Sequence, residues 1–279
     1  MTQTAPSPTP VINTDNITVK LTRDAREIEA AQRLRYRVFY EEFAAKPNSA
    51  MAIARLDFDD FDEYADHLIV IDHSKGDKIV GTYRLLQQDA AKRIGQFYSS
   101  DEYDLTPLLN SNHNLLELGR SCVMPEYRTK SIMNLLWEGI AEYISDHDIG
   151  IMFGCASLQS TDIKSISLPL SYLHHYHLAP EEIRTRALKG CYINMDIIPK
   201  DEFEAKRGFN ELPPLIKGYL RVGAVIGDGA FIDEQFNTTD VCVIMDTRNV
   251  TNRYRKHFER KIQKDIPGKG IQRSESTPE

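Results

Sequence analysis

The chain has 279 residues, of which 41% are hydrophobic and 27% are charged, and its formal net charge is −7. This composition is typical of a globular protein, and an acidic chain gives no support to nucleic-acid binding. The N-terminal stretch MTQTAPSPTPVINTDN has no apolar core flanked by basic residues, and no apolar run reaches the length of a membrane span. We therefore expect a cytoplasmic protein without a signal peptide or a transmembrane helix.

Strand and helix signals alternate along most of the chain. Residues 1–15 are rich in Thr, Pro and Ser and are predicted to be disordered, residues 267–279 are predicted to be a flexible tail, and one domain is expected over 16–266. Within this domain the pattern predicts, in order, a strand at 17–22, a helix at 24–43, a hairpin of 67–72 and 78–87, a strand at 114–124, a helix at 130–147, a strand at 149–158, helical turns over 162–187, strands at 190–198, 222–233 and 239–246, and a basic helix at 248–265.

This order of elements is typical of an α/β fold, with a mixed, twisted sheet flanked by helices. Asp24 is placed to cap the first helix. The strands at 114–124 and 149–158 are joined by a helix, which is the pattern of a parallel strand pair with a right-handed crossover.

The apolar run LLELGRSCVM contains two charged residues, Glu117 and Arg120. Burying a charge is unfavourable unless the charge is paired or used. Residues three apart in a regular strand point to opposite faces, so we predict a bulge near Gly119 that brings both side chains to one face. The bulge would also free a main-chain N–H, at Ser121 or Cys122, to stabilise a developing negative charge. A catalytic carboxylate and a purely structural buried pair are both open at this point.

The turn MPEYRTKS leads directly into the helix at 130–147. The free N–H groups at a helix start, together with Arg128 and Lys130, suit a phosphate group. The glycines of a Walker loop or a dinucleotide fingerprint are missing. The alternative is an ordinary surface turn.

Six carboxylates crowd the segment 57–66, namely Asp57, Asp59, Asp60, Asp62, Glu63 and Asp66. Like charges at this density repel each other unless cations compensate them. Three interpretations are open: a solvated loop, a recognition site for the two amines of a dicationic amino acid, and a metal loop. The metal loop is the weakest, because the spacing of a calcium loop is absent.

The cysteines and histidines give no clear site. The four cysteines lie far apart in strand-like runs, which favours buried thiols in a reducing compartment, with Cys155 as the candidate if one of them is a nucleophile. His174, His175 and His177 cluster in YLHHYHLAPEE, but no second set of ligands has metalloenzyme spacing, so we expect no metal.

Several motifs in one order carry a resemblance to known families. LRYRVFYEEF, DDFDEYADHLIV, GTYRLL and ELGR resemble the acyl-homoserine-lactone synthases, and the strand, turn and helix at 114–147 resemble the core of the GCN5-related N-acyltransferase (GNAT) superfamily. The closer resemblance is to the bacterial L-ornithine Nα-acyltransferases. It covers nearly all of 17–260 and includes ELGRSCV, FGCASL, YLHHYHLAPEE, LIKGYLRVGAVIGDGAFIDEQFNTTDV and RYRKHF.

The resemblance implies a GNAT-like fold with a C-terminal extension, in which the part from about 180 completes the acceptor side. Glu117 and Arg120 are expected to be catalytic, with Glu117 as the general base and Arg120, together with Arg35 and Arg84, organising the cleft or the acidic groups in it. Donor or phosphopantetheine binding is expected at Ser121, Cys122, Val123, Arg128, Lys130 and Ser131. The cleft is expected to include Arg35, Asp59, Asp62, Arg84, Asp228 and Asn237, with Asp59 and Asp62 paired to Arg35, Arg84 or Arg120 if the synthase pattern holds.

The implied reaction is the transfer of a 3-hydroxyacyl group from acyl carrier protein (ACP) to the α-amine of L-ornithine, which gives lyso-ornithine lipid as the first step of ornithine-lipid synthesis. RTKSIM replaces the usual glycine pattern of the superfamily, which suits the single phosphate of acyl-ACP better than the pyrophosphate of CoA. No bound cofactor is expected. The basic terminal helix suggests a surface for ACP or for peripheral contact with the membrane. The alternatives are another amino acid or a homoserine-lactone-type acceptor, and a non-catalytic protein that binds acyl-ACP or lipid.

Overall fold

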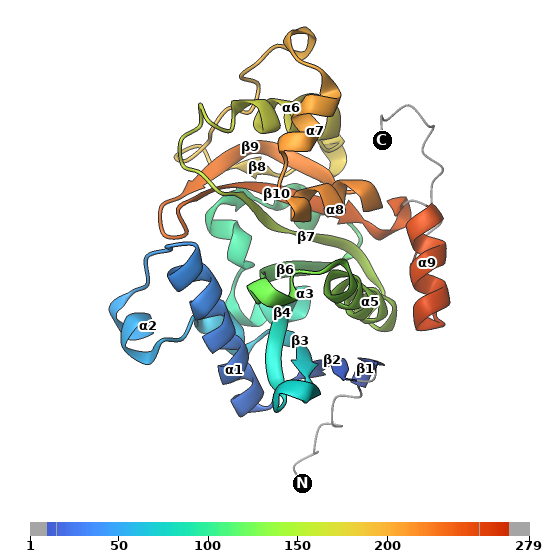
Figure 1. Cartoon of the computed structure of the whole chain (residues 1–279). Helices are drawn as coiled ribbons and strands as arrows, with labels where there is room; N and C mark the ends of the chain where they lie inside the picture. The colour runs from blue at the N-terminus through green and yellow to red at the C-terminus, as the bar shows by residue number, and fades with distance from the viewer. Residues whose placement is uncertain (1–9, 15, 251, 268–279) are drawn as a thin grey trace.

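The computed structural model describes residues 10–14, 16–250 and 252–267. Over these residues the strands follow the order β1-β2-β3-β4-β6-β7-β10-β9-β8-β5 (Figure 1). Their bounds are β1 Pro10–Asn13, β2 Ile17–Thr22, β3 Asp66–Asp72, β4 Lys78–Gln87, β5 Tyr103–Asp104, β6 Asn114–Val123, β7 Ile149–Leu158, β8 Arg186–Ala187, β9 Val225–Asp233 and β10 Thr238–Asp246. The β6–β7 and β8–β9 pairs are parallel and the others are antiparallel, so the predicted mixed sheet and the parallel pair around one helix are confirmed.

Helices cover both faces of the sheet. Their bounds are α1 Ala25–Tyr36, α2 Ser49–Ala54, α3 Gln88–Ile94, α4 Thr106–Leu109, α5 Lys130–Asp146, α6 Ser167–His177, α7 Ala205–Glu211, α8 Pro214–Val222 and α9 Asn252–Ile262. On one face, Gly139 of α5 packs closely against Leu68 of β3. On the same face, the hydroxyl groups of Tyr219 on α8 and Tyr83 on β4 form a hydrogen bond. The opposite face carries α1, α3 and the segment 57–64.

Local chemistry explains where the principal helices begin. Asp24 accepts hydrogen bonds from the N–H groups of Arg26 and Glu27, which confirms it as the cap of α1. The predicted helix at 24–43 is α1 followed by a π-helical segment at 37–42. Thr129 caps α5 and accepts a hydrogen bond from the N–H of Ile132. A hydrophobic stripe then holds α5 against the sheet, with Leu136 and Ile140 fully buried.

Three predictions about the elements are corrected. Residues 190–198 form no strand apart from a single bridge between Ile193 and Ala230. The N–H groups of residues 197 and 198 donate hydrogen bonds to the Ser171 hydroxyl instead, and a turn at Asn194 precedes them. The predicted strand at 222–233 starts at 225, since α8 continues to Val222 and ends at Gly223 with φ +116°. Residues 10–13 fall in a segment predicted to be disordered but form β1, which pairs with β2. Of the two predicted terminal segments, residues 1–9, 15 and 268–279 lie outside the described residues.

Candidate active site

A bulge interrupts β6 at the charged motif. Gly119 is opposite Arg84 on β4, but Cys122 is opposite Thr82, so β6 holds one extra residue between these pairs. The predicted bulge is therefore confirmed. Its left-handed residue is Arg120, with φ +50°, and not the glycine. A Cβ on Gly119 would meet only Arg84 Nε, at 3.9 Å, so a glycine is not required there.

The bulge places Glu117 and Arg120 on the same side of the sheet, where both contact Tyr98. Glu117 is 3% exposed and accepts hydrogen bonds from Tyr98 N at 2.8 Å, Ser99 N at 2.7 Å and Ser99 Oγ at 2.5 Å. The guanidinium of Arg120 lies 4.8 Å from the centre of the Tyr98 ring. Each charge thus has its own partners, and the two do not form a buried pair with each other. Burial raises the pKa of Glu117, against the opposing effect of its Ser99 and Tyr98 donors.

Next to Glu117, charged side chains form a cluster that includes Arg120. We call it the Arg–Asp network, and its members are Arg35, Arg84, Arg120, Asp57, Asp59 and Asp62. Arg35, which is fully buried, donates from Nε to Asp57 Oδ2 at 2.7 Å and from Nη2 to Asp62 Oδ2 at 2.5 Å. Arg84 donates to Asp62 Oδ1 at 3.1 Å and to Asp59. The network therefore joins α1, the acidic segment and the central strand β4.

Arg120 completes the network from β6. Its Nη2 donates to Asp59 Oδ2 at 3.0 Å, and its Nε lies 3.3 Å from Asp57 Oδ2. Burial alone would raise the pKa of Asp62, but the guanidinium groups of Arg35 and Arg84 hold it below its usual range. Three guanidinium groups thus face three carboxylates, so the formal charges balance and each buried charge has a partner.

These contacts decide between the interpretations of the acidic segment. Pairing with arginines is confirmed for Asp59 and Asp62, and the structure adds Asp57, which pairs with Arg35. Asp60 and Glu63 are exposed. A carboxylate already bonded to two guanidinium groups is a poor ligand for a third cation. The structure therefore gives no support to amine recognition by this segment.

Next to Glu117, the strands β6 and β7 part from each other. Their parallel register ends at the pair Glu117 and Phe153, after which β6 stays with β4 and β7 stays with β10. A Cβ at Gly154 would lie 2.2 Å from the carbonyl oxygen of Leu118, so only glycine permits this close approach. Main-chain groups beyond this point have no partner strand across the gap and are available for hydrogen bonds.

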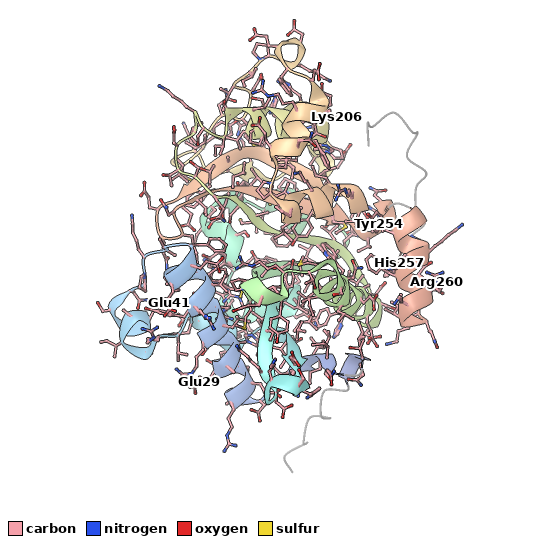
Figure 2. The ribbon with its side chains drawn as sticks, in the orientation of Figure 1. Glu29, Glu41, Lys206, Tyr254, His257 and Arg260 are labelled. Carbon is pink, nitrogen blue, oxygen red and sulfur yellow. The ribbon has the colours of Figure 1, made fainter. Side chains whose placement is uncertain are left out.

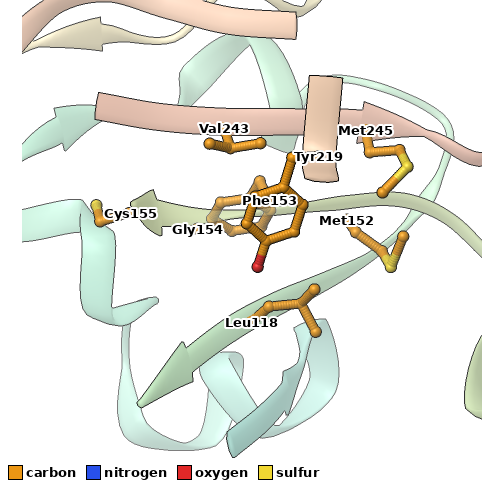
Figure 3. A pocket seen from close by; sticks show the side chains of 8 residues that line it. All are labelled: Leu118, Met152, Phe153, Gly154, Cys155, Tyr219, Val243 and Met245. Carbon is orange, nitrogen blue, oxygen red and sulfur yellow. The ribbon is translucent and has the colours of Figure 1, made fainter. Parts of the chain in front are cut away.

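A small cavity lies at the divergence of β6 and β7. Its volume is about 20 Å³, which is room for about one water molecule. The side chains around it are Leu118, Met152, Phe153, Gly154, Cys155, Tyr219, Val243 and Met245. Figure 3 shows the ring of Tyr219 entering this space from α8 with its hydroxyl directed toward β6.

The predicted donor residues follow the bulge. Cys122 and Val123 are buried, and burial raises the pKa of the Cys122 thiol to about 12. Arg128 makes a bidentate pair with Glu42, at 2.5 and 2.6 Å, and its Nε donates to the carbonyl of Val123. Ser121 contacts the hydroxyl of Tyr83.

At the start of α5, Ser131 is exposed and its hydroxyl bonds to Thr129 Oγ1 at 2.9 Å. Lys130 is the first residue of α5, and its side chain lies outside the described part of the chain. The N–H groups of a first helical turn have no carbonyl partner within the helix, so the predicted phosphate position remains chemically suitable.

Two predicted cleft residues lie outside the Arg–Asp network. Asp228 accepts a hydrogen bond from the Tyr192 hydroxyl at 2.9 Å and pairs with Arg186 at 3.1 Å. Asn237 is an exposed turn residue with φ +56°, immediately before β10. Its neighbour Phe236 is the residue of this turn that reaches the network, 4.9 Å from the Arg120 guanidinium.

The thiol of Cys155 is poorly suited to act as a nucleophile. It lines the cavity, and burial beside Glu102 raises its pKa well above the usual value. Its Sγ–H donates to Glu102 Oε2 at 2.9 Å. A protonated thiol engaged as a donor does not attack an acyl group.

His174 and His175 converge with Asp196 rather than with His177. The potential ligand atoms of these three residues lie within 4.8 Å of one another. His175 Nε2 is 3.3 Å from Asp196 and 2.9 Å from the carbonyl oxygen of Ile198, contacts that an ordinary His–carboxylate pair also makes. The absence of a metal stays a prediction.

The basic residues near the C-terminus mostly bond within the molecule. Lys261 pairs with Glu138 of α5, and Lys264 pairs with Glu142 and Asp146. A further set of bonds holds Arg255, which is buried and donates to the carbonyls of residues 247, 266 and 267. Arg260 remains exposed on α9, at the edge of the molecule (Figure 2). Across the described residues, no helix combines the length and apolar character that crossing a membrane requires.

Comparison with known proteins agrees with this architecture. A family model described as "Acetyltransferase (GNAT) domain" matches residues 34–138. The L-ornithine Nα-acyltransferase of Rhodobacter capsulatus is 45% identical over 249 residues, which cover 88% of this chain and 95% of that protein. The enzyme of the same name from Brucella abortus is 45% identical over 249 residues, covering 87% and 89% of the two chains.

Two solved structures match most of the chain at low sequence identity. A CoA-dependent acyl-homoserine lactone synthase with SAM and isopentyl-CoA has a TM-score of 0.45 and 12% identity, with 91% of this chain and 89% of that chain covered. An N-acyl amino acid synthase from uncultured soil microbes has a TM-score of 0.47 and 11% identity, with 82% and 89% covered. Because it shares 45% identity with named relatives over most of its length, the chain belongs to the L-ornithine Nα-acyltransferase family and is an acyltransferase of the GNAT fold.

Proposed function

We propose that this protein transfers an acyl group from a thioester donor to the α-amine of L-ornithine. The observation that carries the proposal is the 45% identity to relatives named for this reaction, over 249 residues. The site supports it independently. Buried carboxyl groups lie next to the divergence of two parallel strands, where unpaired main-chain groups can bind a thioester and its amide-containing arm.

The donor is proposed to be a 3-hydroxyacyl-ACP, and the product lyso-ornithine lipid, the first intermediate of ornithine-lipid synthesis. The start of α5 offers main-chain N–H groups beside Arg128, which suits one phosphate. The pair between Arg128 and Glu42 fixes the position of the guanidinium before a donor binds. No resident cofactor is needed for this reaction.

The chemistry is direct attack of the neutral amine on the thioester carbonyl. The C–N bond forms, the C–S bond breaks, and one proton must move from the amine to the departing thiolate. The raised pKa of Cys155 supports a route without an acylated cysteine. Glu117 is the proton acceptor predicted from the sequence. Its three hydrogen-bond donors come from Tyr98 and Ser99, and of these only the Ser99 hydroxyl can relay a proton.

ACP and the membrane surface are the proposed macromolecular partners, in the cytoplasm or at the inner face of the membrane. Both partners carry negative charge, and exposed cations such as Arg260 on α9 would attract them. The basic surface is smaller than the sequence predicts, because Lys261 and Lys264 already pair with α5. Binding should therefore be weak and sensitive to salt.

The test mixes the purified protein with 3-hydroxyacyl-ACP and a panel of amino acids and identifies the products by mass spectrometry. Ornithine should be acylated on its α-nitrogen in preference to lysine and arginine, and acetyl-CoA should not replace the acyl-ACP. Product from another amine would keep the chemistry and change the acceptor. Binding of acyl-ACP without any product would indicate a non-catalytic protein.

A further inference from the structure

A second buried carboxyl group, Glu102, lies beside the cavity and outside the Arg–Asp network. Glu102 is 6% exposed and directly follows the short 3₁₀ helix Tyr98–Asp101. Its Oε2 accepts the thiol hydrogen of Cys155, and its Oε1 accepts no hydrogen bond from any described residue. One oxygen of this buried group is therefore free to receive a proton.

Glu102 and Glu117 are linked through two side chains. Glu117 Oε1 is 2.5 Å from Ser99 Oγ, which is 3.4 Å from Cys155 Sγ, which is 2.9 Å from Glu102 Oε2. Cys155 is itself part of the cavity wall where β6 and β7 part (Figure 3). The carboxyl group of Glu102 thus bonds directly to Cys155 of the cavity wall, whereas the carboxyl group of Glu117 reaches the same thiol through the Ser99 hydroxyl.

The surroundings of Glu102 make its carboxyl group unusually basic. Burial raises the pKa of Glu102 to about 8, the hydrogen bond from Cys155 opposes this shift, and neighbouring carboxylates add to it. Burial also raises the pKa of Asp240 to about 6. The titratable groups that face Glu102 are Asp233, Asp240, Glu117, Cys155, Cys191, Cys242, Tyr98 and Tyr103.

We propose that Glu102 accepts the proton of the attacking amine and then returns it to the departing thiolate. The C–N bond forms as the N–H proton moves to the carboxylate, the C–S bond breaks, and the sulfur leaves as a thiol, so that the enzyme ends as it began. Cys155 is the positioning residue that holds the carboxylate at the cavity. The inference rests on the proposed function, because it requires an amine and a thioester.

The properties of Glu102 suit both halves of this transfer. A carboxyl group with a pKa near the working pH exists in both forms, which allows it to accept and to release a proton within one turnover. Its neighbours Asp233 and Asp240 favour the approach of a cationic acceptor. Glu117 has a different environment, since main-chain and hydroxyl donors already stabilise its charge.

The test compares Glu102→Gln with Asp101→Asn, which changes an exposed carboxylate on the preceding residue that accepts a hydrogen bond from Gln96. For Glu102→Gln we expect kcat to fall about 10²–10⁴-fold with little change in KM for the amine. In the wild type, kcat should rise with pH through an inflection near 8, and this inflection should be absent in the variant. Asp101→Asn should keep both the rate and the inflection. Thermal denaturation checks that each variant is folded.

Other results would overturn the inference. A Glu102→Gln enzyme with normal kcat, a change confined to KM, or loss of the inflection in Glu117→Gln but not in Glu102→Gln would each remove Glu102 from this step. Glu102→Asp keeps a carboxylate and should recover part of the lost rate, whereas a purely structural role predicts no such recovery. If the wild type acylates an amine other than ornithine, the proposed function fails, and the same comparison is made with that amine. A wild type that acylates no amine refutes both.

Discussion

Removing one charge from the Arg–Asp network should destabilise the whole protein. Asp62 is 8% exposed and accepts hydrogen bonds from Arg35 at 2.5 Å, Gln32 at 2.9 Å and Arg84 at 3.1 Å. Asp62→Asn leaves an uncompensated positive charge in a buried cluster and points an amide N–H group at guanidinium donors. Breaking a buried ion pair on one side costs about 3–5 kcal/mol, a large fraction of the stability of a domain.

The matched control is Asp60→Asn, which changes an exposed carboxylate in the same segment and should alter the stability by less than about 0.5 kcal/mol. Urea denaturation at about pH 7 measures both variants, with the single tryptophan as the probe. Trp137 lies on α5, 5.2 Å from the ring of Tyr219, so its fluorescence reports the packing of α5 against α8.

The pH dependence of the difference gives a second check. The guanidinium groups lower the pKa of Asp62 in the folded state, so its contribution is fully present above the unfolded pKa of about 4. That contribution is lost as the pH falls through the folded pKa. The gap between wild type and Asp62→Asn should therefore be constant near neutral pH and should narrow below about pH 4. An Asp62→Asn protein as stable as Asp60→Asn would refute the view that this network stabilises the fold.

Three further changes test separate parts of the site. Arg120→Lys keeps the charge but removes the planar guanidinium, whose Nε and Nη2 contact Asp57 and Asp59 separately. Turnover should therefore fall about 10²-fold in a protein that still folds, which steady-state kinetics and thermal denaturation measure. Gly154→Ala places a methyl group 2.2 Å from the Leu118 carbonyl oxygen and should lower the free energy of unfolding, measured by urea denaturation, by about 1–3 kcal/mol. The control Gly190→Ala, whose added methyl group meets nothing within 4 Å, should leave the stability unchanged. Equal stabilities of the two variants would contradict the close approach. Cys155→Ser retains a hydrogen-bond donor for Glu102 and should keep most of the turnover. Intact-mass analysis of the wild type mixed with acyl donor should find no acylated cysteine. An acyl adduct on Cys155 would contradict direct attack of the amine on the thioester.

The elements that the sequence predicted well are those in which burial and periodicity agree. The amphipathic helix α5 and the apolar strands β7 and β10 match their predicted bounds within one residue. The segment 190–198 has the same alternating pattern as a strand, yet its N–H groups bond to Ser171. A side chain 26 residues away in the sequence decided this conformation, and local pattern cannot reveal such a partner.

The residue types of the site were visible in the sequence, but their assignments depended on the fold. Asp57 and Asp60 belong to one acidic segment, and only the structure shows that Asp57 is fully buried between Arg35 and Arg120 while Asp60 is exposed. No motif in the sequence marks Glu102 as a functional residue. Its significance comes from burial and from Cys155, a residue 53 positions later.

The bulge in β6 explains how an arginine is tolerated in an apolar strand. In a regular strand Arg120 would share a face with Leu116 and Leu118, which pack in the larger apolar core. A guanidinium there would be buried without a carboxylate, at a cost of several kcal/mol. The extra residue turns Arg120 toward Asp57 and Asp59 and returns Ser121 to the face of Tyr83. A left-handed φ at a non-glycine residue costs about 1–2 kcal/mol, which is less than the unpaired charge that it avoids.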